Sequence, residues 1–250
     1  MRDNDRVSDS TIPHDGSRLP DSDPSERGSR LIVAIDGPSG AGKGTIARAV
    51  ATRLRYRHID TGAMYRALAW KATHDSIDLS NEAALSALAD RINLDVAEGR
   101  VRVDDHDIAA AIRTPEIDTA SAVVARYPRV RTALIARQRA LGTAGGVVME
   151  GRDIGTVVFP GAEVKIFLDA SPEERARRRA TDPSHTAGRG VAAIQDVATA
   201  LEERDRSDRT RAASPLTQAA DAVVIDTTTL SIEDAVEKVM EIVREKGSRQ

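Results

Sequence analysis

The chain has 250 residues, of which 40% are hydrophobic, so it can form one α/β domain with insertions and a sizeable core. A net charge of −3 and an aromatic content of 2% argue against binding of nucleic acid through a basic surface or base stacking. The absence of cysteine excludes a disulfide framework, a thiolate nucleophile and cysteine-bound zinc. The sequence has no run of about 18 apolar residues to span a bilayer and no apolar signal-peptide stretch. A cytoplasmic protein is therefore expected.

The first elements of the fold are predicted from composition and periodicity. Residues 1–29 are rich in Asp, Arg, Ser, Gly and Pro, so we expect a disordered tail, either merely solvated or regulatory. The folded domain is expected to occupy residues 30–247. It begins with the apolar run Leu31–Ile35, which is typical of a strand buried on both faces. A glycine-rich turn follows, and Thr45–Leu54 has the pattern of a helix.

Strands and helices then alternate along the chain, which predicts an α/β fold with a parallel sheet and helices on both faces. Between about 92 and 109, short alternating pieces around Glu98-Gly99 predict a small antiparallel insert. The other predicted strands are Tyr56–Ile59, Val147–Met149, Val164–Leu168 and Ala222–Ile225. The other predicted helices are Ala63–Lys71, Glu82–Arg91, Val130–Leu141, Pro172–Arg179, Val191–Arg206 and Ile232–Glu245.

The turn after the first strand has the composition of a phosphate-binding loop. Its glycines allow consecutive backbone N–H groups to point at one anion, and the following helix N-terminus adds unsatisfied donors. Lys43 supplies a full charge for the β- and γ-phosphates. Gly44 stands where the common pattern places a magnesium-binding hydroxyl, so we expect Thr45 to contact phosphate rather than the metal. The loop reads Gly37, Pro38, Ser39, Gly40, Ala41, Gly42, Lys43, Gly44 and Thr45.

Two later segments carry groups suited to a second substrate. Thr61 stands at a predicted helix N-cap with Arg66 about one and a half turns beyond it, and together they can grip a phosphate. The alternative is an ordinary cap with a surface arginine. Arg152 and Asp153 follow a predicted strand, at the edge where α/β folds bind ligands. The Arg152 guanidinium can bind a phosphate through two N–H groups, and the Asp153 carboxylate can accept from an exocyclic amine. The alternative is a strand end at which the two side chains form a salt bridge.

A third segment, Glu203–Arg211, is dense in charge. On a helix Arg204, Asp208 and Arg211 have the spacing i, i+4, i+7, which predicts one shared face. The alternative is a solvated charged surface. Glycine, proline and small polar residues punctuate the stretch before this segment, and they suit a flexible lid at about 180–195 that closes over phosphates.

Together these segments resemble the bacterial cytidylate kinase family, from about Leu31 to Val243. The resemblance implies a P-loop NTPase three-layer fold with a central parallel sheet and a helical lid. It also implies a nucleoside monophosphate (NMP) binding region at about 60–120, enlarged by the small β-rich insert. The blocks that carry it are Ile35–Thr45, Asp60–Arg66, Pro128–Arg131, Gly151–Pro160, Lys165–Ala170 and Glu203–Arg211.

The resemblance further implies an ATP-dependent kinase that converts CMP or dCMP into the diphosphate, with Mg²⁺ bound mainly through the ATP phosphates and water. Residues implied to stabilise charge during transfer are Lys43, Arg206 and Arg152. Those implied to hold the acceptor phosphate are Thr61, Arg66, Arg152 and Arg211, with Arg204 and Asp208 at the ribose and Arg131 and Asp153 at the cytosine. The family often has serine nine residues before the arginine equivalent to Arg131. Ala122 stands there, with Ser121 beside it, so either the helix is displaced slightly or one base contact is lost.

Two alternatives remain open. One is a related kinase for UMP, AMP or a metabolite hydroxyl, and Asp153 argues against it because its carboxylate accepts from the amino group of cytosine. The other is a non-catalytic nucleotide-binding protein, and the presence of Lys43, Arg152 and Arg206 argues against that. We expect a monomer that acts on ATP and CMP or dCMP, without nucleic-acid or membrane partners.

Overall fold

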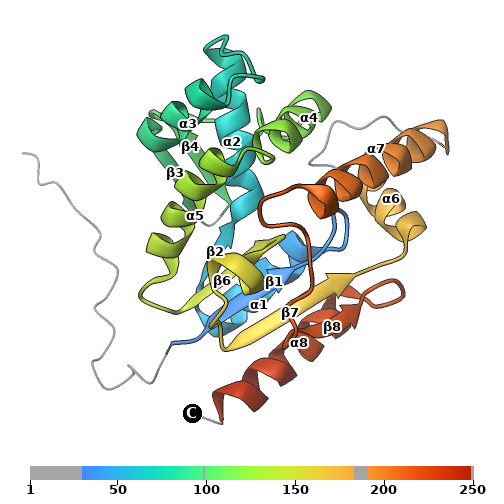
Figure 1. Cartoon of the computed structure of the whole chain (residues 1–250). Coiled ribbons are helices and arrows are strands. Elements are labelled where there is room, and N and C mark those ends of the chain that lie inside the picture. Colours follow the sequence, from blue (N-terminus) through green and yellow to red (C-terminus); the bar gives the residue numbers. More distant parts are fainter. Residues whose placement is uncertain (1–29, 98, 183–190, 249–250) are drawn as a thin grey trace, which may run out of the picture.

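The computed structural model describes residues 30–97, 99–182 and 191–248, in which five parallel strands form a central sheet (Figure 1). The strand order is β2-β6-β1-β7-β8. The expected tail over 1–29 and the middle of the expected lid, 183–190, lie outside the described residues. The strands are β1 (Ile32–Asp36), β2 (Arg57–Asp60), β6 (Val147–Gly151), β7 (Val164–Asp169) and β8 (Val223–Asp226).

Side chains of β1 alternate between the two faces of the sheet, because successive residues of a strand point to opposite sides. Val33 and Ile35 belong to the apolar layer beneath α1 (Lys43–Leu54) and α8 (Ile232–Gly247). Ala34 belongs to the opposite layer, beneath the single turn η2 (Ile154–Val158) and α5 (Pro128–Gly142). The three-layer α/β architecture predicted from the sequence is confirmed.

A second group of elements stands beyond the carboxyl ends of the strands and has an apolar core of its own (Figure 1). It contains α2 (Thr61–His74), α3 (Glu82–Arg91) and α4 (Pro115–Val124), with the outer face of α5. The short strands β3 (Leu94–Ala97), β4 (Arg100–Val103) and β5 (His106–Asp107) pair antiparallel within it. The predicted antiparallel insert is therefore confirmed.

Helices α6 (Pro172–Thr181) and α7 (Val191–Thr210) pack against each other beyond the carboxyl end of β7, and α7 also contacts α4 (Figure 1). Ser171 caps α6, since its Oγ accepts the Glu174 N–H at 3.3 Å, and Pro172 takes the first helical position. Among the residues that the structure describes, no helix has the length and apolarity required to cross a membrane.

One local prediction was wrong, and one helix was missed. The N-cap of α2 is Asp60 rather than Thr61, because Oδ1 of Asp60 accepts the Ala63 N–H at 2.9 Å. Helix α4 was not predicted, although its start has a recognisable signal. Thr114 accepts the Ile117 N–H at 3.3 Å, and Pro115 occupies the first helical position.

Candidate active site

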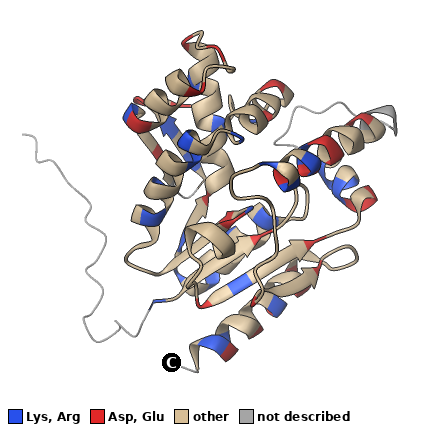
Figure 2. Ribbon diagram, viewed as in Figure 1, with Lys and Arg blue, Asp and Glu red and all other residues tan. Residues whose placement is uncertain are grey.

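A cavity of about 940 Å³ opens at the carboxyl ends of β1, β2 and β6. This is the edge at which open α/β sheets bind ligands. The phosphate-binding loop and α2 line one part of it, and α6 and α7 line another. The elements that line the cavity carry many basic residues, interspersed with acidic ones (Figure 2). The lining arginines are Arg48, Arg66, Arg113, Arg131, Arg152, Arg177, Arg178, Arg179, Arg204 and Arg211.

The loop between β1 and α1 has the backbone conformation of an anion cradle. Gly40 and Gly42 have φ values of 79° and 88°, which side chains rarely adopt. A Cβ at Gly40 would lie 2.9 Å from that of Arg175, so this glycine also allows α6 to approach the loop. Helix α1 begins at Lys43, two residues earlier than predicted, and its N-terminus therefore points its donors into the cavity.

The ammonium group of Lys43 lies inside this loop, where its Nζ donates to the carbonyl of Pro38 at 2.6 Å. Burial, together with the neighbouring Arg152 guanidinium, lowers the pKa of Lys43 to about 7, although nearby carboxylates oppose the shift. Both causes oppose the positive charge. An anion bound in the loop would reverse this balance and stabilise the charged amine.

Ser39 connects the loop to the rest of the site through all of its polar groups. Its N–H donates to Asp205 Oδ1 at 3.3 Å, and its carbonyl accepts from Arg175 at 3.0 Å. Its hydroxyl accepts from Arg152 Nη2 at 2.7 Å. Arg175 and Asp205 also form a buried ion pair with each other. The loop is thus joined to α6, to α7 and to the turn after β6.

Asp208 lies at the centre of the second cluster of charges. Its carboxylate accepts from Arg152 Nε at 2.9 Å and from Arg211 Nη1 at 3.3 Å, and Arg204 lies 3.9 Å away. The predicted shared face is therefore present, although Arg211 stands just past the end of α7 and continues its last turn through an N–H bond to Ser207. Arginines from two separate segments meet at this one carboxylate.

Arg131 and Asp153 form a pair in the floor of the cavity, with Arg131 Nη2 2.5 Å from Asp153 Oδ2. Arg131 is 2% exposed, and its guanidinium lies over the ring of Tyr65 at 5.3 Å. Arg211 approaches the other oxygen of Asp153 at 3.8 Å. The two residues predicted to read a base are therefore in contact, and each has a fixed orientation.

Four guanidinium nitrogens in this cluster are buried without a hydrogen-bond partner: Nε of Arg66, Arg131 and Arg204, and Nη2 of Arg211. Such groups cost free energy unless a ligand satisfies them. Burial, together with the guanidinium groups of Arg152 and Arg66, lowers the pKa of Arg204 to about 10, although Asp208 opposes the shift. The site therefore holds more buried positive charge and more donors than the protein itself satisfies.

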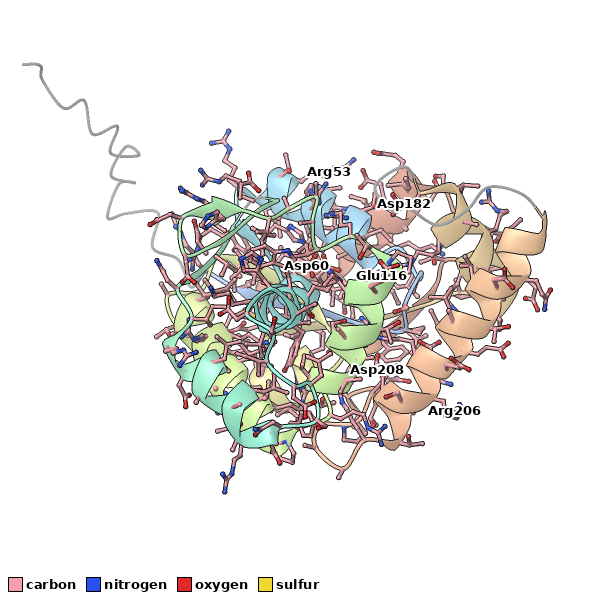
Figure 3. The ribbon with its side chains drawn as sticks, turned by 90° about the horizontal axis from the view of Figure 1, so that it is seen from above. Arg53, Asp60, Glu116, Asp182, Arg206 and Asp208 are labelled. Carbon is pink, nitrogen blue, oxygen red and sulfur yellow. The ribbon has the colours of Figure 1, made fainter. Side chains whose placement is uncertain are left out.

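Two predicted residues lie differently from expectation. Arg206 is exposed and is absent from the cavity lining, because it is about 200° around α7 from Arg204 and Asp208. Figure 3 shows Arg206 at the outer edge of α7 and Asp208 on its inner side. The described arrangement thus does not bring Arg206 to the site. Thr61 does line the cavity, but its hydroxyl donates to the Glu150 carbonyl at 2.7 Å.

Ser121 is fully buried, and its hydroxyl donates to the Asp118 carbonyl within α4 at 2.8 Å. Ala122 lines a second cavity of about 260 Å³ between α4 and α7, which shares Arg113 and Arg204 with the first. No hydroxyl therefore faces the cavities from these two positions. Of the two outcomes expected for this departure, the lost contact is the one that the geometry supports.

The sequence interpretation missed one side of the cavity. Arg178 donates to the Thr227 hydroxyl at 2.9 Å and to its carbonyl at 2.5 Å, and Ile232 beside them is 59% exposed. These residues form a partly apolar groove next to the phosphate-binding loop. The apolar Ile232 at the start of α8 was the available signal for this groove. Sequence patterns did not connect it with Arg178 on the other side, because the two residues are 54 positions apart in the chain.

Glu150 was also left without a role. Its carboxylate is buried at the end of β6, where Oε1 lies 2.9 Å from Nε2 of His58. A Cβ placed on Gly44 would lie 3.3 Å from the same oxygen. Glu150 therefore occupies the space beside the loop that a larger residue after Lys43 would fill.

Comparisons with known proteins agree with this geometry. The family model for cytidylate kinase matches residues 33–245. A cytidylate kinase of Solibacter usitatus is 46% identical over 217 residues, which cover 87% of this chain and 94% of that protein. One of Pelotomaculum thermopropionicum is 50% identical, covering 83% and 93%, and one of Geobacillus kaustophilus is 47% identical, covering 87% and 98%. The resemblance found in the sequence is thereby confirmed, and the chain belongs to the cytidylate kinase family.

Proposed function

We propose that the protein transfers the γ-phosphoryl group of ATP to CMP or dCMP, giving ADP and the cytidine diphosphate. The observation that carries the proposal is the group of buried arginines with unsatisfied nitrogens beside the phosphate-binding loop. Phosphoryl transfer requires two phosphates in line and positive charge around the transferred group. This cavity has a cradle for one phosphate chain and a separate cluster of arginines for another.

In this proposal ATP occupies the loop side of the cavity. Backbone N–H groups of the loop and of α1 bind its β- and γ-phosphates, and Lys43 adds a charge. The adenine lies in the groove between Arg178 and Ile232, where an apolar side chain and a guanidinium plane can pack on the two faces of a base.

The acceptor nucleotide occupies the other side. Thr61 and Arg66, at the start of α2, hold its phosphate together with Arg152 and Arg211. Arg204 and Asp208 bind the ribose. The base lies against the Arg131 and Asp153 pair, in which a fixed carboxylate accepts from the cytosine amino group and repels the carbonyl of uracil.

Magnesium is implied by the family, and the residues present fit its preferences. Among the described residues no group of three or more His, Asp or Glu side chains could cage a metal by itself. Mg²⁺ instead favours one or two carboxylates together with substrate phosphates and water. Glu150 is the carboxylate placed to take part, since it lies against Gly44 of the loop. Bound there with ATP, the ion would neutralise charge on the phosphates.

The chemistry asks little else of the chain. An oxygen of the acceptor phosphate, already anionic at neutral pH, attacks the γ-phosphorus, and the bond to the β–γ bridging oxygen breaks as ADP leaves. No general base is needed. Lys43 and Arg152 are the residues proposed to stabilise the developing charge, and Arg152 is placed between the two sites by its bonds to Ser39 and Asp208.

The test is ADP production from Mg·ATP with CMP, dCMP, UMP, AMP and GMP offered separately. Turnover should be strongest with CMP and dCMP and should be lost in Lys43→Ala. Arg209→Ala is the matched control, because Arg209 is an exposed arginine of α7 that does not line the cavity. Equal turnover of UMP would refute the assignment of the base to Arg131 and Asp153. No turnover with any acceptor would refute the proposed reaction.

A further inference from the structure

Asp36 ends β1 and directly precedes Gly37 of the phosphate-binding loop. From its position in the sequence it would be assigned to the donor site. Its side chain does not line the cavity, however, and the residue is only 5% exposed. The question is what a buried carboxylate does at this place.

The carboxylate faces the turn after β6. Oδ1 accepts the N–H of Ile154 at 2.8 Å, and Oδ2 accepts the N–H of Gly155 at 2.7 Å. These are the first two residues of η2, whose N–H groups have no partner within the turn itself. Asp36 therefore caps this turn from a strand 118 positions earlier in the chain.

This external cap changes what Asp153 can do. Asp153 stands at the N-cap position of η2, where an aspartate ordinarily accepts N–H groups with its own side chain. Its side chain makes no capping bond here. Its carboxylate instead meets Arg131 at 2.5 Å and lies 3.8 Å from Arg211. Asp36 thus takes over the capping, and Asp153 keeps its oxygens turned toward the acceptor site.

The fit around the carboxylate is close. A Cβ on Gly155 would lie 3.4 Å from Asp36 Oδ2 and 3.2 Å from the side chain of Lys165, so the turn packs closely against both side chains. Burial, with a smaller contribution from nearby Asp153, raises the pKa of Asp36 to about 6, although the two backbone hydrogen bonds and Lys43 oppose the shift. Carboxylates whose pKa is shifted this far by burial cluster at functional sites.

We propose that Asp36 is a positioning residue for the acceptor nucleotide: although it adjoins the phosphate-binding loop, it acts by holding the Arg152–Asp153 turn in place. The proposal rests on the proposed function, in which these two residues contact the acceptor. It assigns to Asp36 no contact with either substrate.

The first test is Asp36→Asn, which keeps the shape of the side chain but places an NH₂ group against one of the two N–H donors. The KM for CMP should rise about tenfold or more, whereas the KM for ATP should stay within about twofold. Asp169→Asn is the matched control, since Asp169 ends the neighbouring strand β7 and makes no bond to η2. An equal rise in both KM values, or none in either, would overturn the proposal.

The second test does not depend on turnover. Amide hydrogen exchange should become faster in the segment 152–158 of Asp36→Asn, while the segment 37–42 keeps its wild-type rate. Faster exchange in 37–42 alone, or in neither segment, would contradict the proposal even in a fully active variant. The proposed function fails separately, if the wild-type protein does not turn over CMP.

A double substitution supplies the last check. If Asp36 acts through the turn, its effect on the KM for CMP should largely disappear when Asp153→Asn is already present. If the double variant instead shows the product of the two single increases in the KM for CMP, Asp36 acts by another route and the proposal is wrong.

Discussion

At the scale of single residues, the site is defined by charges that the protein leaves poorly compensated. Lys43 and Arg204 both have lowered pKa values because they are buried beside other cations. Four buried guanidinium nitrogens of the site have no hydrogen-bond partner. A structural ion-pair network would be expected to satisfy its donors. These residues therefore depend on an anionic ligand to complete their interactions.

The pKa of Lys43 leads to a prediction about proton uptake. Because the folded-state pKa is lowered to about 7, Lys43 is mostly uncharged above pH 7 in the free protein. Phosphate groups bound beside it favour the charged form, so binding of Mg·ATP at pH 8 should take up close to one proton. Calorimetric titrations in buffers with different ionisation enthalpies measure this number directly.

Lys43→Arg is the control for this measurement, because a guanidinium remains charged throughout the accessible pH range. Uptake should be lost in this variant even where it binds Mg·ATP. Wild-type binding enthalpies that do not vary between buffers would contradict the lowered pKa. The same shift has a consequence for stability: from pH 7 to about 10, stability should rise, since the unfolded chain binds the proton more tightly.

At the scale of elements, the loop, α6 and α7 act as one unit. Arg175 of α6 and Asp205 of α7 pair with each other and also bond to opposite ends of Ser39. Asp205 stands between Arg204 and Asp208 in the sequence, so α7 cannot shift along the loop without moving both of those residues. The position of the acceptor-binding face therefore depends on this pair.

Asp205→Ala should consequently lower the free energy of unfolding by about 3 kcal/mol, because it leaves Arg175 buried without its partner. Urea denaturation followed by circular dichroism measures the change. Asp196→Ala is the control on the same helix, at an exposed position. A loss no larger than that of the control would show that the pair does not hold the elements together.

At the scale of the whole molecule, two regions with separate apolar cores meet across the cavity (Figure 1). The chain has a net charge of −3, yet ten arginines and Lys43 line this cavity, against six carboxylates (Figure 2). This excess of positive charge attracts the phosphates of nucleotides toward the cavity.

Attraction of this kind predicts that salt weakens acceptor binding. The KM for CMP should rise severalfold between about 50 and 500 mM KCl, because added ions screen the arginines of the cavity. Steady-state kinetics at saturating ATP measures it. An unchanged KM would mean that the exposed part of the cluster contributes little to binding. An equal rise in the KM with potassium acetate would exclude specific competition by chloride.

Much of this protein follows from local sequence. The apolar run at Leu31–Ile35 and the glycine pattern up to Thr45 predicted β1, the loop and α1 to within two residues, since burial and backbone freedom act at short range. The antiparallel insert around Gly99 was predicted by alternation alone. The shared face of Arg204 and Asp208 followed from helical spacing.

Only the tertiary structure determined which of these segments contact one another and through which side chains. Asp36 reaches Ile154, Arg175 reaches Ser39, and Arg178 reaches Thr227, in each case through contacts between distant parts of the chain. The outward direction of Arg206 likewise depends on which face of α7 packs inward. Periodicity and motif spacing describe a segment by itself, whereas a positioning contact exists only once two segments have been packed together.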